Sequence, residues 1–119
     1  MKVVADPRFA RWYAALTPAF RASVAALLGY LSASTKADLC RPRAALIEGS
    51  RHYPAIWELR RSTRQGEREV ILRILVAIHH DDTAVVLVGG DKAGRWVEWY
   101  EVAIPTADAY YDDYLRRQQ

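Results

Sequence analysis

The stretch from Val70 to Ile78 constrains the fold most, because it is almost wholly apolar and only Arg73 interrupts it. It is too short to span a bilayer, and it has the length and β-branched content of a strand. A strand that lacks polar alternation must be covered on both faces. We therefore predict a central strand. A buried unpaired charge is costly, so Arg73 either pairs with a carboxylate such as Glu58 or opens into a cleft.

Two further strands are predicted beside this one. Ala55 to Arg61 alternates loosely between apolar and polar residues, and Ala84 to Val88 is apolar. The polar segments between the strands read as turns. We place these turns at Thr63 to Glu67 and at His79 to Thr83, and we expect Gly89-Gly90 to end the third strand.

Helix signals lie on both sides of the strands. Asp6-Pro7 and Thr17-Pro18 each combine a capping residue with a proline at the first helical position, which predicts two helices joined by a tight turn. A short strand is expected at Val3-Val4. Pro42, Gly49 and Pro54 punctuate the segment from 36 to 54, for which we predict no regular structure.

The C-terminal segment also has a helical pattern, but Pro105 disfavours one continuous helix. We expect a short helix from Trp96 to Ala103 and a second helix with Pro105 in its first turn. The predicted fold is a single α+β domain over residues 1–119. An N-terminal helical hairpin packs on a small, mainly antiparallel sheet that a C-terminal helix closes, with the helices on one sheet face.

Arginine dominates the basic residues. The formal net charge is +3, and only three of the 17 basic residues are Lys. The planar guanidinium suits phosphate binding and base stacking, so the bias fits a nucleic-acid partner, although a GC-rich genome would explain it equally well. The charges are also segregated, since the segment from Arg41 to Arg73 is rich in Arg, whereas Glu98 to Asp113 holds acids only.

Several classes of protein are disfavoured. Cys40 is the only cysteine, so no disulfide or cysteine-based metal site can form within the chain. The N-terminus carries charges before any apolar block, unlike a secretory signal. We therefore expect a cytoplasmic protein without membrane contact. His52, His79 and His80 lack the spacing of zinc ligands, so we predict neither a metal site nor a cofactor.

Cationic residues mark the predicted strands. If neighbouring strands align, Arg60, Arg73 and Lys92 could converge on one surface and hold a scissile phosphate. The sequence Gly89-Gly90-Asp91-Lys92 lacks the glycine spacing of a phosphate-binding loop or a dinucleotide fingerprint. A tight turn with a solvated lysine is therefore an equally good interpretation of that motif.

Aromatic residues follow the glycines, as in proteins that stack unpaired RNA bases on rings while cations contact phosphates. Trp96 and Tyr100 are four residues apart and could equally belong to the core. Of these two, we assign a function only to Tyr100. His52, beside Arg51, is a candidate for substrate contact, although solvated loop histidines are more common.

Taken in order, these motifs resemble the RelE/ParE superfamily of bacterial toxins, and more closely its HigB-like, phage-derived branch. The resemblance extends from about Asp6 to Leu115. It is carried by Gly49-Ser50-Arg51-His52, Glu58-Leu59-Arg60, Arg73-Ile74-Leu75, Leu87-Val88-Gly89-Gly90-Asp91-Lys92, Trp99-Tyr100, Ile104-Pro105, Ala107-Asp108, Tyr111 and Leu115.

The resemblance implies a toxin of a type II toxin–antitoxin module, neutralised by a cognate antitoxin that is usually a small helix-turn-helix protein. Its implied activity is metal-free cleavage of mRNA on the ribosome, in which the ribose 2′-hydroxyl attacks the adjacent phosphate. By position, Arg60 and Lys92 would contact the phosphate, and Tyr100 would stack on a base or transfer a proton. Our candidate catalytic residues are Arg60, Arg73, Lys92 and Tyr100, and our candidate substrate-binding residues are Arg51, His52, Arg95 and Trp99.

One departure leaves the general base open. The lysines that RelE-type members carry near the first long strand are replaced here by Trp57 and Glu58, and arginine is a poor base because it stays protonated. His52 is a conditional candidate. Two alternative functions remain, a ParE-like toxin that poisons DNA gyrase and a non-catalytic remnant that only binds its antitoxin.

Overall fold

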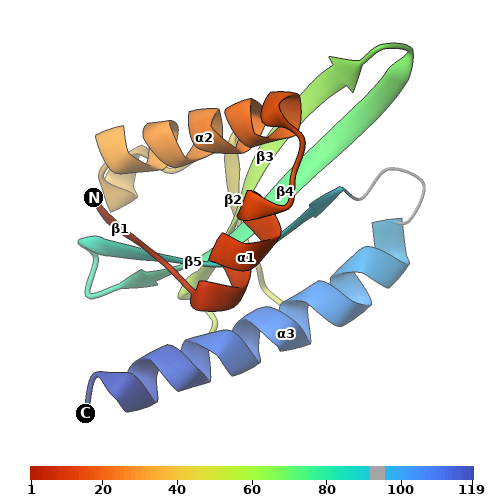
Figure 1. Ribbon diagram of the computed structural model, residues 1–119. Helices are drawn as coiled ribbons and strands as arrows, with labels where there is room; N and C mark the ends of the chain where they lie inside the picture. The colour runs from red at the N-terminus through yellow and green to blue at the C-terminus, as the bar shows by residue number, and fades with distance from the viewer. Residues whose placement is uncertain (92–95) are drawn as a thin grey trace.

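A five-stranded sheet forms the centre of the computed structural model, which describes residues 1–91 and 96–119 (Figure 1). The strand order is β1-β5-β4-β3-β2; β1 runs parallel to β5, and the other neighbouring pairs are antiparallel. The strands are β1 Lys2–Ala5, β2 Ala44–Leu46, β3 Ile56–Gln65, β4 Arg68–His79 and β5 Thr83–Asp91.

The two N-terminal helices begin at the predicted caps. The Asp6 carboxylate accepts a hydrogen bond from the Arg8 backbone N–H, and the Thr17 hydroxyl accepts one from that of Phe20. Both residues therefore satisfy N–H groups that have no partner within the helix. The helices are α1 Pro7–Ala14, α2 Pro18–Ala33 and α3 Trp96–Arg117, with a 3₁₀ turn at Lys36–Asp38.

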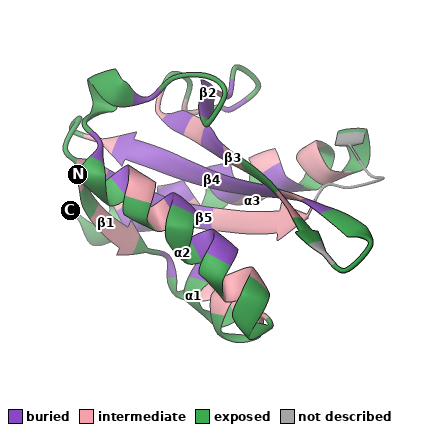
Figure 2. Cartoon of the chain, turned by 90° about the horizontal axis from the view of Figure 1, so that it is seen from above, coloured by how far each residue is buried: buried purple, intermediate pink, exposed green. Residues whose placement is uncertain are grey.

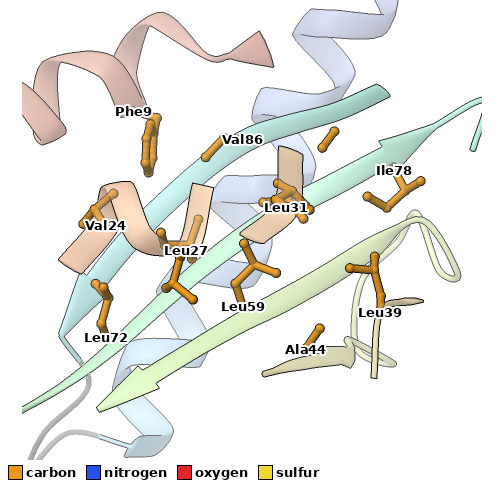
Figure 3. Packing of buried hydrophobic residues seen from close by; sticks show 13 residues of the cluster. Phe9, Val24, Leu27, Leu31, Leu39, Ala44, Leu59, Leu72, Ile78 and Val86 are labelled. Atoms are coloured by element: carbon orange, nitrogen blue, oxygen red, sulfur yellow. The ribbon is translucent and has the colours of Figure 1, made fainter. Parts of the chain in front are cut away.

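Helices cover both faces of the sheet, so the expectation of helices on one face was wrong (Figure 1). The reason lies in β4, which buries Leu72 and Ile74 against α1 and α2, and Leu75 and Ala77 against α3. A strand that is apolar on both sides needs cover on both sides. Figure 3 shows the first of the two cores, in which side chains from α1 and α2 point onto β3, β4 and β5.

The predicted α+β class is confirmed, as are the helical hairpin and the closing C-terminal helix. Burial is greatest along β4, whereas the outer faces of α1 and α2 and the tip of the β3–β4 hairpin are exposed (Figure 2). Among the described residues, no helix has the length and apolar content needed to cross a membrane.

Pro105 does not divide the C-terminal helix, contrary to the prediction of two helices. It is exposed, whereas Ala103, Ala107 and Tyr111 on the same helix are buried against the sheet. Proline removes one hydrogen bond within a helix. Packing of the residues before and after Pro105 keeps the helix continuous. The backbone hydrogen bond that proline removes lies on the exposed side, where water can replace it.

The two glycines Gly89 and Gly90 lie within β5 and do not end it, which corrects another expectation. They continue the ladder by pairing with Ile74 and Arg73 of β4. A Cβ atom on Gly89 would lie 2.4 Å from the ring of Trp12, and one on Gly90 would lie 2.4 Å from Nε1 of Trp99. The glycines are therefore explained by tryptophans that pack against both faces of the strand.

Regular structure also extends further than predicted. Segment 36–54, expected to be irregular, contains the 3₁₀ turn and β2. The β3–β4 hairpin is longer than expected, and its turn is reduced to Gly66, with a φ of 66°, and Glu67. Ladder pairing with a partner strand outweighs the polar composition of residues 62 to 69.

Candidate active site

A row of facing residues crosses the middle of the sheet. Arg60 of β3 pairs with Arg73 of β4, which in turn pairs with Gly90 of β5. Side chains at facing positions point to the same side of a sheet. Arg73 points to the opposite side of the sheet from its neighbour Ile74 and to the same side as Leu75, which packs against α3. The two arginines therefore lie on the face that α3 covers.

The carboxylate of Glu58 holds both arginines. Its Oε1 lies 2.7 Å from Nε of Arg60, in a hydrogen bond, and 3.1 Å from Nε of Arg73, without hydrogen-bond alignment. The Glu58 side chain is only 2% exposed. Nη1 of Arg73 also donates to the Leu72 carbonyl at 2.9 Å. The pairing proposed for Arg73 from the sequence is therefore present.

Tyr100, in the first turns of α3, completes this cluster. Burial, and next its hydrogen bond to Glu58, raise the pKa of Tyr100 to about 12, while its hydrogen bond with Arg73 acts in the opposite direction. The phenol therefore remains protonated at neutral pH and can donate a proton or a hydrogen bond. We call Glu58, Arg60, Arg73 and Tyr100 the arginine cluster.

The arginine cluster opens into a groove of about 350 Å³ lined by Pro42, Arg43, Arg60, Arg61, Ser62 and Arg73. The groove forms just before β2 begins beside β3, and the backbone N–H of Arg60 donates to the Arg43 carbonyl at 2.7 Å. Sequence reasoning missed Arg43 and Arg61. The dense run of arginine from 41 to 73 was the available signal, but β2, which brings Arg43 to β3, was not predicted.

Of the other residues that the sequence assigned to this site, only Trp99 can be placed. Lys92 and Arg95 lie outside the described residues. Trp99 is half-buried against Gly90, and its ring centroid lies 5.0 Å from that of Tyr100. Trp99 also lines an apolar cavity of about 350 Å³ with Val88 and Val102. Its ring therefore adjoins the arginine cluster through Tyr100.

Arg51 and His52 lie elsewhere, in a polar cluster that fastens the loop before β3 to the second half of α3. Ser50 donates to Asp108 at 2.5 Å, and the backbone N–H of Arg51 donates to the same carboxylate at 2.9 Å. Nε2 of His52 lies 2.6 Å from Asp112. We call Ser50, Arg51, His52, Asp108 and Asp112 the loop clasp.

The loop clasp and the arginine cluster are separate. Asp112 follows Tyr100 by twelve residues in one helix, about 18 Å along the axis. Hydrogen bonds from Arg51, and next from His52, hold the pKa of Asp112 below its ordinary value. The structure therefore brings Arg60, Arg73 and Tyr100 together and leaves Arg51 and His52 apart from them, engaged with carboxylates.

This arrangement suits anion binding. Four arginines line one groove, and two of them share the carboxylate of Glu58. Planar guanidinium donors match the oxygens of a phosphate group. Within residues 1–91 and 96–119, no three His, Cys, Asp or Glu side chains gather as metal ligands would.

Comparisons with known proteins agree on one family. A family profile described as Phage derived protein Gp49-like (DUF891) matches residues 11–112. A Mycobacterium tuberculosis protein named toxin HigB3 is 33% identical over 115 residues, which cover 97% of this chain and 94% of that protein. Another from the same organism, named toxin HigB2, is 40% identical over 74 residues, which cover 62% of this chain.

The match to HigB2 spans only 35% of that protein, whereas the match to HigB3 spans nearly all of both chains. No solved structure matches the chain significantly. The resemblance to the HigB-like, phage-derived branch of the toxins is thereby confirmed. The chain belongs to the phage-derived Gp49-like family, alongside relatives that carry the name of HigB toxins.

Proposed function

We propose that this protein is the toxin of a toxin–antitoxin module and acts as a metal-independent endonuclease on mRNA at the ribosome. The observation that carries the proposal is the groove lined by four arginines, two of which, Arg60 and Arg73, share Glu58. The protonated phenol of Tyr100 adjoins Arg73. An RNA phosphodiester is an anion with the geometry that guanidinium groups bind best. The names of the relatives support the assignment to toxins.

The proposed reaction is attack of a ribose 2′-hydroxyl on the adjacent phosphate, in which the hydroxyl proton passes to water and the bond from phosphorus to the 5′-oxygen breaks. Negative charge develops on the phosphate oxygens as the new bond forms, and Arg60 and Arg73 would stabilise it. Lys92, whose position follows β5 in sequence, would add a further positive charge. Tyr100 would stack on a base or donate a proton to the departing 5′-oxygen, because its hydroxyl is protonated at neutral pH.

The proposal extends to partners. The family implies a cognate antitoxin, and we propose a small helix-turn-helix protein for that role. The translating ribosome would present the mRNA as a single strand, whose phosphates and bases are accessible to cationic and aromatic side chains. The site would therefore act in the cytoplasm.

Induced expression in a bacterial host, with growth curves and primer extension on abundant transcripts, tests the proposal. The variants are wild type, an Arg60→Ala/Lys92→Ala double substitution and Arg11→Ala, which removes an exposed arginine of α1 far from the groove in sequence. We expect wild type and Arg11→Ala to arrest growth and cut translated transcripts, and the double variant to do neither.

Growth arrest with intact transcripts would contradict the nuclease and favour gyrase poisoning, which DNA-damage reporters would then detect. If none of the variants affects growth, the remaining function is antitoxin binding alone, and a pull-down with the proposed helix-turn-helix antitoxin would measure it.

A further inference from the structure

Glu58 is a buried carboxylate for which the reaction proposed above has no role. It lies on β3 with its side chain 2% exposed, between Arg60 on the same strand and Arg73 on β4. A buried charge is costly unless its partners compensate for it. Here, two arginines and the Tyr100 hydroxyl all engage the one carboxylate.

The contacts constrain how the arginines are presented. Both guanidinium groups meet Oε1 of Glu58 through Nε, the nitrogen nearest the chain. Among the residues that the structure describes, the hydrogen bond of the Arg60 guanidinium is made through Nε and none through its terminal nitrogens, and Arg60 lines the groove. Fixing Nε limits the rotation of the long side chain, so the terminal nitrogens face the groove without further ordering.

The same contacts argue against Glu58 as a general base. A base must reach the proton that it removes, within hydrogen-bond distance or through one water. The carboxylate is buried and already engaged by three side chains. We propose that Glu58 is a positioning residue, which holds Arg60, Arg73 and Tyr100 in the arrangement that binds the scissile phosphodiester. This inference rests on the proposed nuclease function.

Two effects of a Glu58→Gln substitution then oppose each other. The substitution removes a negative charge beside the groove, which strengthens attraction for RNA phosphates. It also weakens the contacts that orient the guanidinium groups, and small misplacements of catalytic groups slow chemistry strongly. We therefore expect kcat to fall by about ten- to a hundredfold while KM is unchanged or lower.

A double-mutant cycle in a purified translation system tests this. Cleavage rates are measured for wild type, Glu58→Gln, Arg60→Ala and the double variant, each shown to be folded by circular dichroism at the assay temperature. A positioning residue acts through its partners. Glu58→Gln should therefore lower the cleavage rate by a much smaller factor in the Arg60→Ala background than in wild type. The pH profile of Glu58→Gln should keep the shape of the wild-type profile.

Three outcomes would overturn the inference. The Glu58→Gln variant could cleave at the wild-type rate. The substitution could lower the cleavage rate by the same factor in both backgrounds, or it could remove the acidic limb of the pH profile. The last result would make Glu58 the base. Glu58→Asp adds a control, because it keeps the charge on a shorter side chain and should recover part of the lost rate.

A readout without RNA cleavage separates this inference from the proposed function. In ¹⁵N NMR spectra, the Nε–H signal of Arg60, which donates a hydrogen bond to Glu58, should exchange slowly with water in wild type and rapidly in Glu58→Gln. Inorganic phosphate should perturb the Arg60 signal in wild type. If the protein cuts no RNA and these results hold, only the nuclease fails. If exchange and phosphate response are equal in both proteins, the positioning role fails.

Discussion

Two polar clusters meet the same helix, yet their charge balance differs. In the arginine cluster, Arg60 and Arg73 share the one carboxylate of Glu58, and the groove adds two further arginines. In the loop clasp, Arg51 and His52 face two carboxylates, Asp108 and Asp112. A cluster with excess cations attracts an anion from outside, whereas a cluster whose donors already meet carboxylates satisfies itself and holds the fold.

This comparison predicts opposite consequences for the two clusters. Removing a cation from the arginine cluster should mainly lower activity. Removing a carboxylate from the loop clasp should mainly lower stability. A variant that violated this division would show that charge balance does not separate function from structure in this protein.

The largest effect is expected from Arg73→Ala. Loss of one oriented donor to a developing oxyanion lowers rates by about a hundredfold or more, and Glu58 keeps Arg60 as a partner. Cleavage of a reporter mRNA in a purified translation system measures the loss, with Arg11→Ala as the control. Wild-type rates for Arg73→Ala would remove Arg73 from the catalytic group.

Asp108→Ala should lower the free energy of unfolding by about 2 kcal/mol, because it leaves buried donors without an acceptor. Asp108 is 3% exposed and accepts hydrogen bonds from the Ser50 hydroxyl and the Arg51 backbone. Urea unfolding measures the change. Glu101→Ala, which alters an exposed acid on the same helix, should change stability little. Cleavage per folded molecule should stay near wild type if the clasp is structural.

Gly90→Ala should lower the free energy of unfolding by about 1 to 2 kcal/mol, since an added Cβ would displace the Trp99 ring. Gly29→Ala is a matched control, because nothing lies within 4 Å of its added Cβ and alanine favours helices by about 0.5 to 1 kcal/mol. Thermal unfolding compares the two variants. Equal effects would mean that Trp99 does not pack tightly on β5.

The smallest effects concern pH. Burial, and next Glu58, raise the pKa of Tyr100 from 10.0 to about 12. The corresponding stability is complete below pH 10 and is lost as pH rises toward 12, because the unfolded state releases its proton first. The Tyr100→Phe variant should lack this alkaline loss in unfolding experiments. If both proteins lose stability equally, Tyr100 does not titrate as the structure indicates.

The loop clasp should respond on the acidic side. Hydrogen bonds from Arg51 and His52 hold the pKa of Asp112 below 3.8. Its contribution to stability is therefore present above that value and is lost as pH falls below it. Asp112→Asn should flatten this acidic decline slightly, since the carboxylate is partly exposed. An unchanged decline would assign acid sensitivity to other carboxylates.

Local sequence determined much of the architecture. Asp6-Pro7 and Thr17-Pro18 begin their helices as expected, because capping depends on neighbours within one turn. The apolar run through β4 marked the central strand. The predictions made from Pro105 and from Gly89-Gly90 were wrong, because proline usually interrupts a helix and a pair of glycines usually ends a strand. Tertiary contacts outweighed that tendency, with sheet packing at Pro105 and tryptophan rings against the glycines.

The sequence by itself determined the two N-terminal helices, the three long strands and the gathering of arginine in the middle of the chain, because capping, periodicity and composition act over short distances. Only the tertiary structure decided that Arg43 and Arg61 join Arg60 and Arg73, that Glu58 holds the last two, and that His52 turns to Asp112 instead. Those contacts depend on strand register and on the placement of α3. Both are set by burying two apolar cores at once, which no local pattern encodes.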